Sequence, residues 1–376
     1  MLNRKNKFIL FVFCLVMLFP VYSRYTDWFD VFSLHGVAEE QTPQMKYDIK
    51  LYFSGDFQFV AESRMKQTLG GRNFFIRVYN QLRFNLFGKT TARNVVFGKN
   101  EYLFEKPYLD SYIGLDMLPV DSLNLRIKQL EKIQTILENQ GKTFVFVLAP
   151  SKCYYYPEYL PEGYLKIGKN VARNYDRFVS ALSSSKLNII DFNKYFVELK
   201  KNTKYPLFPQ HGIHWSIYGA CLASDSIIKF IEHESRCNLP DLTWNKVESG
   251  VPRDSDYDLG NLLNLLFQRK SLMMGYPNFF IESGDHFKQA KAVVIGDSFF
   301  WTIINVGFAN SFKSLQYRYY NYETFNIKSS SNSNSLNEEI LKSDLVILIS
   351  TDCNLRRLGW GSIEEMLTLE NEMNIN

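Results

Sequence analysis

A serine in this chain follows a pattern that could present a nucleophile at the end of a strand. The apolar run 292–295 leads into Gly296-Asp297-Ser298. Its β-branched residues favour a buried strand, and Gly296 would allow a sharp turn where a Cβ would obstruct the backbone. Ser298 would then begin a helix, whose N–H groups can stabilise an oxyanion, with the Ser298 N–H as the best donor. We expect Asp297 to cap the turn, although a helix cap without chemistry fits the same spacing.

A histidine in a second segment could act as the base for this serine. His211-Gly212-Ile213-His214-Trp215 stands just before a predicted helix over 217–231. An imidazole with a pKa of about 6.5 suits proton transfer at neutral pH, so we expect His214 to take the proton from Ser298. The structural alternative is a half-buried histidine whose ring nitrogens are satisfied by the backbone.

Alternating strands and helices must bring these residues together. Apolar strands are predicted at 143–148, 187–191, 292–295 and 345–349, with helices at 122–139, 217–231 and 336–341. This alternation predicts an α/β fold with a doubly wound, mostly parallel sheet, whose sites lie at the carboxyl ends of the strands. The rule places Lys152, Ser298 and Asp352 on one edge. Tyr154-Tyr155-Tyr156 and Trp215 could form an aromatic wall there, or pack as core and surface residues.

The region before this sheet is predicted to be helical and then hairpin-like. Apolar residues recur at helical spacing from 57 to 87, with a break at Gly70-Gly71, and residues 94–104 read as two short strands around a turn. The polar segment 326–335 is expected to be a surface loop.

Composition sets the class of protein. The chain has 376 residues, of which 46% are hydrophobic, with 31 Phe and 23 Tyr. It is long enough for one large α/β domain or two modest ones with a buried core. A net charge of +4 is too small to indicate a nucleic-acid partner.

The N-terminus has the pattern of an export segment. A basic stretch at 3–7 precedes twelve apolar residues at 8–19. That run is short for a membrane span of about 20 residues but fits a signal sequence, and no small-x-small cleavage site follows it. We favour an uncleaved anchor over residues 1–23, with a connector at 24–56 and one domain at 57–376. The basic end would stay in the cytoplasm and the rest would be exported.

The cysteines do not indicate a metal. Cys14, Cys153, Cys221, Cys237 and Cys353 have no metal-ligand spacing, so we expect no zinc site. Cys153 and Cys353 both follow predicted strands, and a disulfide between them is possible.

Seven segments occur in the order typical of one family. They are the apolar N-terminal segment, the helix 72–87, residues 96–104, residues 149–152 with 156–161, His214-Trp215 with 218–220, Asp258-Leu259 with 262–265, and 296–299. In these the chain resembles the SGNH-hydrolase-like polysaccharide O-acetyltransferases, the alginate O-acetyltransferase AlgJ/AlgX type.

The resemblance implies an activity and a cellular place. It implies an enzyme anchored in the inner membrane, with its domain on the periplasmic or extracellular side of the cell envelope. Ser298 would carry an acetyl group and pass it to a polysaccharide hydroxyl, with His214 as the base and no cofactor. Coenzyme A is not expected outside the cytoplasm, so the acetyl group would come from a multi-span membrane acyltransferase or from an acylated small donor. Lys152 could contact the donor or the acceptor.

The chain departs from the family at the acid that should orient the base. In the relatives an aspartate stands two residues before the histidine, where this chain has Gly212. The aspartate three residues before it, usual in other SGNH hydrolases, is replaced by His211. A backbone carbonyl could hold the ring of His214, Asp352 could replace the acid, or catalysis could be lost. An esterase of the same fold and a non-catalytic polysaccharide-binding subunit are therefore alternatives to the acetyltransferase.

Overall fold

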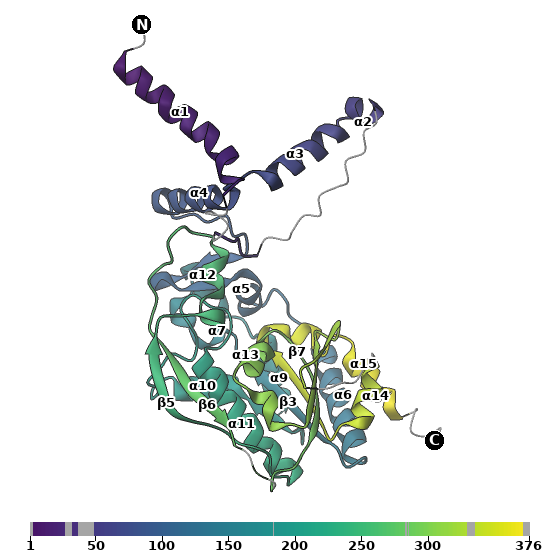
Figure 1. Ribbon diagram of the computed structural model, residues 1–376. Helices are drawn as coiled ribbons and strands as arrows, with labels where there is room; N and C mark the ends of the chain where they lie inside the picture. Colours follow the sequence, from purple (N-terminus) through teal and green to yellow (C-terminus); the bar gives the residue numbers. More distant parts are fainter. Residues whose placement is uncertain are drawn as a thin grey trace. The chain divides into compact units, whose positions relative to one another are not determined.

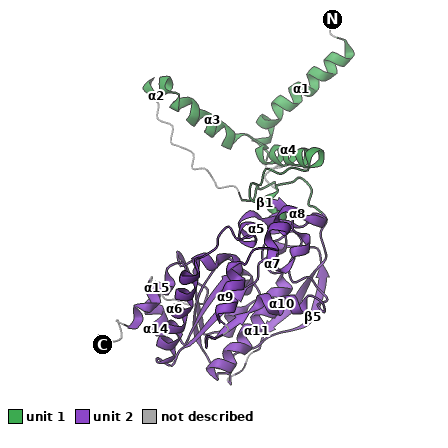
Figure 2. Ribbon diagram, turned by 180° about the vertical axis from the view of Figure 1, so that it is seen from behind, with its two compact units in different colours: residues 1–95, 260–269 green, residues 96–259, 270–376 purple. Residues whose placement is uncertain are grey.

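The computed structural model describes residues 3–26, 32–36, 49–182, 184–282, 284, 286–328 and 335–370. The chain divides into two compact units, one formed by 1–95 with 260–269 and the other by 96–259 with 270–376 (Figure 2). Most of the predicted connector at 24–56 and of the predicted polar loop at 326–335 lies outside the described residues.

The larger unit is built on a six-stranded sheet with the order β4-β3-β10-β7-β8-β9 (Figure 1). Its strands are β3 (Thr143–Ala149), β4 (Ile189–Asp191), β7 (Lys291–Gly296), β8 (Ser314–Tyr319), β9 (Glu323–Asn326) and β10 (Leu345–Thr351). All neighbours pair in parallel except β8 and β9, which are antiparallel. The predicted α/β fold with a mostly parallel, doubly wound sheet is confirmed.

Helices cover both faces of this sheet, which explains why its central strands are apolar throughout. Alternate residues of β3 face opposite ways: Val145 and Val147 join one buried cluster, and Phe144 and Phe146 join the other. The helices of the first cluster are α5 (Lys106–Tyr112), α7 (Lys152–Tyr155), α10 (Phe192–Leu199), α11 (Ile217–Ser235) and α13 (Phe299–Asn305). Those of the second are α6 (Val120–Glu138), α9 (Asn174–Leu182), α14 (Leu336–Lys342) and α15 (Ser362–Leu367).

The four predicted strands and three predicted helices of this unit are all found, while β8 and β9 were not predicted. Gln316 and Arg318 interrupt the apolar pattern of β8, yet both are buried. The predicted hairpin is confirmed as β1 (Val95–Phe97) and β2 (Leu103–Glu105), joined by a 3-10 turn. The other elements are a second small sheet of β5 (Leu242–Gly250) and β6 (Met274–Ile281), the helix α8 (Glu162–Gly168), and α12 (Asp258–Leu262).

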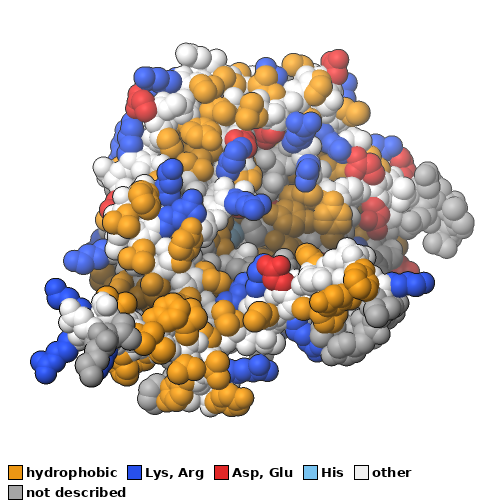
Figure 3. Space-filling view, turned by 90° about the horizontal axis from the view of Figure 1, so that it is seen from above, with side chains coloured by type: hydrophobic (Ala, Val, Ile, Leu, Met, Phe, Trp, Pro, Cys, Tyr) orange, Lys and Arg blue, Asp and Glu red, His pale blue; other side chains and the backbone are white. Residues whose placement is uncertain are grey.

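The smaller unit contains α1 (Arg4–Ser23), α2 (Ile49–Ser54), α3 (Asp56–Thr68) and α4 (Arg72–Phe87). The helix predicted over 57–87 is divided as expected, because Gly71 adopts a left-handed conformation with φ 67°. Helix α1 is long and apolar enough to cross a membrane. The apolar side chains of α1 are exposed. Figure 3 shows a face of the molecule on which hydrophobic side chains are interspersed with lysine and arginine.

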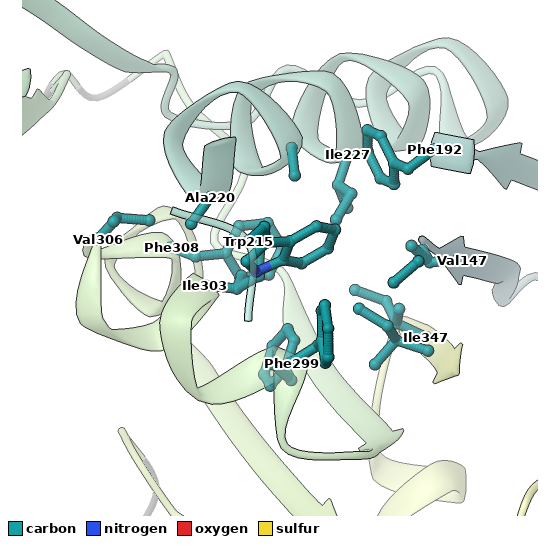
Figure 4. Packing of buried hydrophobic residues seen from close by; sticks show 14 of the residues in the cluster. Val147, Phe192, Trp215, Ala220, Ile227, Phe299, Ile303, Val306, Phe308 and Ile347 are labelled. Atoms are coloured by element: carbon teal, nitrogen blue, oxygen red, sulfur yellow. The ribbon is translucent and has the colours of Figure 1, made fainter. Parts of the chain in front are cut away.

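Trp215 belongs to the core of the larger unit. Its side chain is fully buried, its ring packs at 5.4 Å from that of Phe299, and its indole N–H donates to the hydroxyl of Thr302. Figure 4 shows it enclosed by aliphatic and aromatic side chains from α11, α13 and the sheet. Tyr155 and Tyr156 are also buried. The aromatic wall expected from these residues is therefore wrong, and the alternative of core packing holds for them.

Gly296 leaves no room for a side chain between β7 and β10. A Cβ at this position would lie 2.3 Å from Cγ2 of Ile349 on the neighbouring strand. We expect Gly296→Ala to lower the free energy of unfolding by about 1–3 kcal/mol, because the core would be overpacked. Urea unfolding of the full-length protein in detergent measures this. Gly163→Ala is the control, since a Cβ there meets nothing within 4 Å; equal losses in both variants would contradict the explanation.

Candidate active site

Ser298 is held at the carboxyl edge of the sheet by the aspartate that precedes it. The Asp297 side chain is buried, and its Oδ2 accepts hydrogen bonds of 2.8 Å each from the Thr351 N–H, the Thr351 hydroxyl and the Asn354 amide. Its Oδ1 accepts from the Phe299 N–H at 3.2 Å. Asp297 thus links the end of β7 to the end of β10 and fixes the start of α13, where Ser298 is the N-cap residue.

Gly296 is needed for a reason other than the predicted one. It is the last residue of β7, and its backbone is not among those with positive φ. A side chain there would collide with Ile349 on β10. Close packing of two strands, rather than a sharp turn, therefore requires the glycine.

His214 lies directly against Ser298. Its Nε2 is 3.0 Å from the Ser298 Oγ, and its Nδ1 is 2.9 Å from Oδ2 of Asp258. Since Nδ1 faces a carboxylate, the neutral ring carries its proton there, which leaves Nε2 free to accept the serine proton. The other oxygen of Asp258 accepts a 2.8 Å hydrogen bond from the Ile213 N–H, so the carboxylate fixes both the ring and the peptide before it.

The carboxylate that faces His214 comes from a segment that was not considered for this role. Asp258 appeared only as part of a family-like motif, 44 residues away from the histidine. The absence of a side chain at Gly212 explains how Asp258 can approach His214. A Cβ at Gly212 would lie 2.5 Å from the carbonyl oxygen of Ser255, so the segment 253–258 occupies the space that a side chain at position 212 would fill.

Asp352 does not orient His214. It is buried on the same edge of the sheet, where its Oδ2 accepts a 3.1 Å hydrogen bond from the Ser151 hydroxyl. Burial raises the pKa of its carboxyl to about 7. The suggestions that Asp352 or a backbone carbonyl holds the imidazole are both at odds with the structure, because the ring nitrogen already faces Asp258.

Lys152 is also buried, so the prediction that it contacts the donor or the acceptor is not supported. Its ammonium donates three hydrogen bonds of 2.7–2.9 Å, to the carbonyl oxygens of Leu103, Gln210 and Gly212. Burial lowers the pKa of this lysine to about 7. Lys152 therefore links β2 to the segment that carries His214, and it does so from a buried position that does not line the cavity.

His211 has a structural position. Its side chain is buried, Nε2 lies 3.1 Å from the Glu101 carbonyl oxygen, and its ring meets that of Tyr257 edge to face. It does not take the place of the orienting aspartate.

Ser298 and His214 open into a cavity of about 370 Å³. Burial, together with the nearby charge of Asp258, raises the pKa of the Glu105 carboxyl in its wall. The Tyr320 phenol is a second polar neighbour of the Ser298 hydroxyl, and burial raises its pKa. The other lining residues are Pro107, Tyr108, Ile213, Tyr319, Cys353 and Asn354.

Sequence reasoning missed Glu105, Tyr108, Tyr319 at the end of β8 and Tyr320 after it. Glu105 adjoins the family-like segment 96–104, which was the one available signal. Cys353 is a free thiol, as is Cys153, so the disulfide considered between them is not formed.

The buried carboxyl of Asp352 makes stability depend on pH. Its pKa is raised from 3.8 to about 7 on folding. The stabilising contribution of the protonated form is therefore complete below pH 4 and is lost as the pH rises through about 7. We expect the wild type to lose up to about 4 kcal/mol relative to Asp352→Asn over this range. Urea unfolding of both proteins from pH 4 to 8 measures it, and a difference that stays constant with pH would contradict the assignment.

Comparison with known proteins agrees with this architecture. Residues 95–317 match the family described as "SGNH hydrolase-like domain, acetyltransferase AlgX". No curated protein matches the chain.

Among solved structures, the O-acetyltransferase domain of Pseudomonas putida AlgJ has 15% identity and a TM-score of 0.47, covering 74% of this chain and 99% of that domain. Bacillus cereus PatB1 has 14% identity and a TM-score of 0.44, covering 69% and 96%. Pseudomonas aeruginosa AlgX has 13% identity and a TM-score of 0.45, covering 72% and 67%. With the family match extending over more than half of its length, the chain belongs to the SGNH hydrolase-like acetyltransferases of the AlgX type.

Proposed function

We propose that this chain is an exported O-acetyltransferase that carries an acetyl group on Ser298 and transfers it to a polysaccharide hydroxyl. The observation that supports this most is the continuous contact from Asp258 through His214 to Ser298 beside an open cavity. Family membership supplies the reaction class. The hypothesis of a non-catalytic subunit depended on a missing carboxylate, and Asp258 removes that reason.

In the first half of the reaction, Ser298 Oγ attacks the carbonyl carbon of the acetyl donor while His214 Nε2 takes its proton. The Asp258 carboxylate stabilises the imidazolium that forms. The C–O bond to the leaving group then breaks, and His214 returns the proton to that group. The product is an acetyl ester on Ser298 and a free donor alcohol.

In the second half of the reaction, Ser298, His214 and Asp258 transfer the acetyl group from Ser298 to the acceptor. A sugar hydroxyl enters the cavity, gives its proton to His214 Nε2 and attacks the acetyl carbon of the ester. Breaking the bond to Oγ releases the acetylated sugar, and His214 returns the proton to Ser298. The Ser298 N–H, at the start of α13, and the Tyr320 hydroxyl, a neighbour of the Ser298 hydroxyl, are suited to stabilise the oxyanion in both halves.

The N-terminal region would place the enzyme at a membrane. Helix α1 has 20 residues and few charges, consistent with an uncleaved anchor over 1–23, a connector at 24–56 and a catalytic region at 57–376. The anchor would keep the catalytic region in the cell envelope, outside the cytoplasm. There a multi-span membrane acyltransferase is the proposed source of acetyl groups, since the reaction needs a donor on that side.

Acetylation of Ser298 is the direct test. Incubation of the purified protein with an activated acetyl ester should add one acetyl group, and peptide mass spectrometry should find it on Ser298. The Ser298→Ala variant should remain unlabelled. If the parent protein stays unmodified, or if the variant is labelled to the same extent, the proposal is wrong.

Replacement of the orienting acid tests the role of Asp258. We expect Asp258→Asn to slow acetyl-enzyme formation on the order of ten-thousand-fold, because the amide no longer holds the useful tautomer of His214. A stopped-flow assay of the leaving group measures the rate. Asp352→Asn is the control and should stay close to the wild-type rate.

The position of the acid can be tested in the same assay. Adding Gly212→Asp to Asp258→Asn restores a carboxylate where the relatives have it. We expect no recovery, because a side chain at position 212 collides with Ser255 and Pro209. Recovery of the rate would show that the segment 253–258 can move aside.

A further inference from the structure

Two aromatic residues beside the active site have an unusual backbone conformation. Tyr320, in the turn after β8, has φ 49°, and Trp360, between Asp352–Arg357 and α15, has φ 47°. Bulky residues rarely adopt this left-handed region, and they do so where the surrounding structure fixes them. Their rings nevertheless meet, with centroids 4.9 Å apart and planes at 77°. Two separate strained segments thus converge on one aromatic contact.

This contact adjoins the nucleophile. Tyr320 lines the cavity that contains Ser298 and His214, and the ring of Tyr319 lies 4.4 Å from it in the same wall. Trp360 packs against Tyr320, so the three rings form one cluster that begins in the wall of this cavity.

Trp360 is only partly buried, in contrast to the fully buried Trp215. Among the residues that the structure describes, none accepts a hydrogen bond from the Trp360 indole N–H, whereas the Trp215 N–H is bonded to Thr302. A half-buried tryptophan offers an apolar ring and a polar donor side by side.

Such a surface matches a pyranose ring, whose C–H groups pack on aromatic faces and whose hydroxyls need polar partners. We propose that Trp360, Tyr320 and Tyr319 form a binding platform for a sugar ring of the acceptor polysaccharide, with the ring being acetylated beside Ser298. This inference rests on the proposed function, since it assigns the acceptor side of the same site. Glu105, an acidic residue in the cavity wall, would accept from a hydroxyl of the bound sugar.

The test compares two acceptors of the same acetyl-enzyme. The enzyme is first acetylated with an activated ester, and the acetyl group is then released to methanol or to pyranose tetrasaccharides, namely cellotetraose, chitotetraose and tetramannuronate. We expect Trp360→Ala to lower the ratio of tetrasaccharide to methanol transfer roughly tenfold, and Trp360→Phe to keep most of it. Methanol has no ring to stack, so the ratio separates platform binding from a general loss of folding.

Tyr322→Ala is the matched control. Tyr322 lies in the same turn but is 81% exposed, and its removal should leave the ratio unchanged. The inference is overturned if Trp360→Ala leaves the ratio at the wild-type value, if both acceptors lose rate equally, or if the acetylated wild type transfers to none of the three sugars. Failure of the proposed function would look different, because Ser298 would then not be acetylated at all.

Discussion

The hydrogen bond between Asp258 and His214 is the interaction on which the rest of the active site depends. One oxygen of the carboxylate holds the imidazole, and the other holds the peptide N–H just before it. Because Asp258 belongs to a different segment from His214, the two segments must pack closely, and Gly212 is where they do so. The glycine that looked like a missing acid is thus the space into which the acid-bearing segment fits. The absence of a carboxylate at position 212 and the presence of the Asp258 carboxylate beside His214 both follow from the close packing of these two segments.

Two buried ionisable groups lie next to the candidate site without lining its cavity. Two groups with strongly shifted pKa values, Lys152 and Asp352, are buried and bound to the backbone or to a neighbouring hydroxyl. The proposed reacting residues, Ser298 and His214, line the cavity instead, where a substrate could reach them. A search for perturbed pKa values would find these two supporting groups as well as Glu105 and Tyr320 in the cavity wall. Lys152 supports the position of His214, since two of its hydrogen bonds fix the carbonyl groups of Gln210 and Gly212 in the histidine segment.

Local pattern predicted the parts of the fold that local physics determines. Continuous apolar runs gave the four central strands, and the turn after β7 and the helix start after His214 indicated the two residues that meet. The strand β8 escaped notice because Gln316 and Arg318 are buried in it. Asp258, Glu105 and Tyr320 reach the site only through the tertiary fold. Lys152 and Trp215 were assigned to the site from their position on an edge, although an edge position does not tell whether a side chain points outward or into the core.

The bonding of Asp297 has a consequence for how such enzymes can diversify. The serine turn is fixed through one fully bonded carboxylate to Thr351 at the end of β10 and to Asn354, which follows that strand. Exposed positions such as Tyr322 make none of these bonds, so they can change while Ser298 keeps its position. Sequence variation at such exposed positions is therefore compatible with an unchanged serine turn.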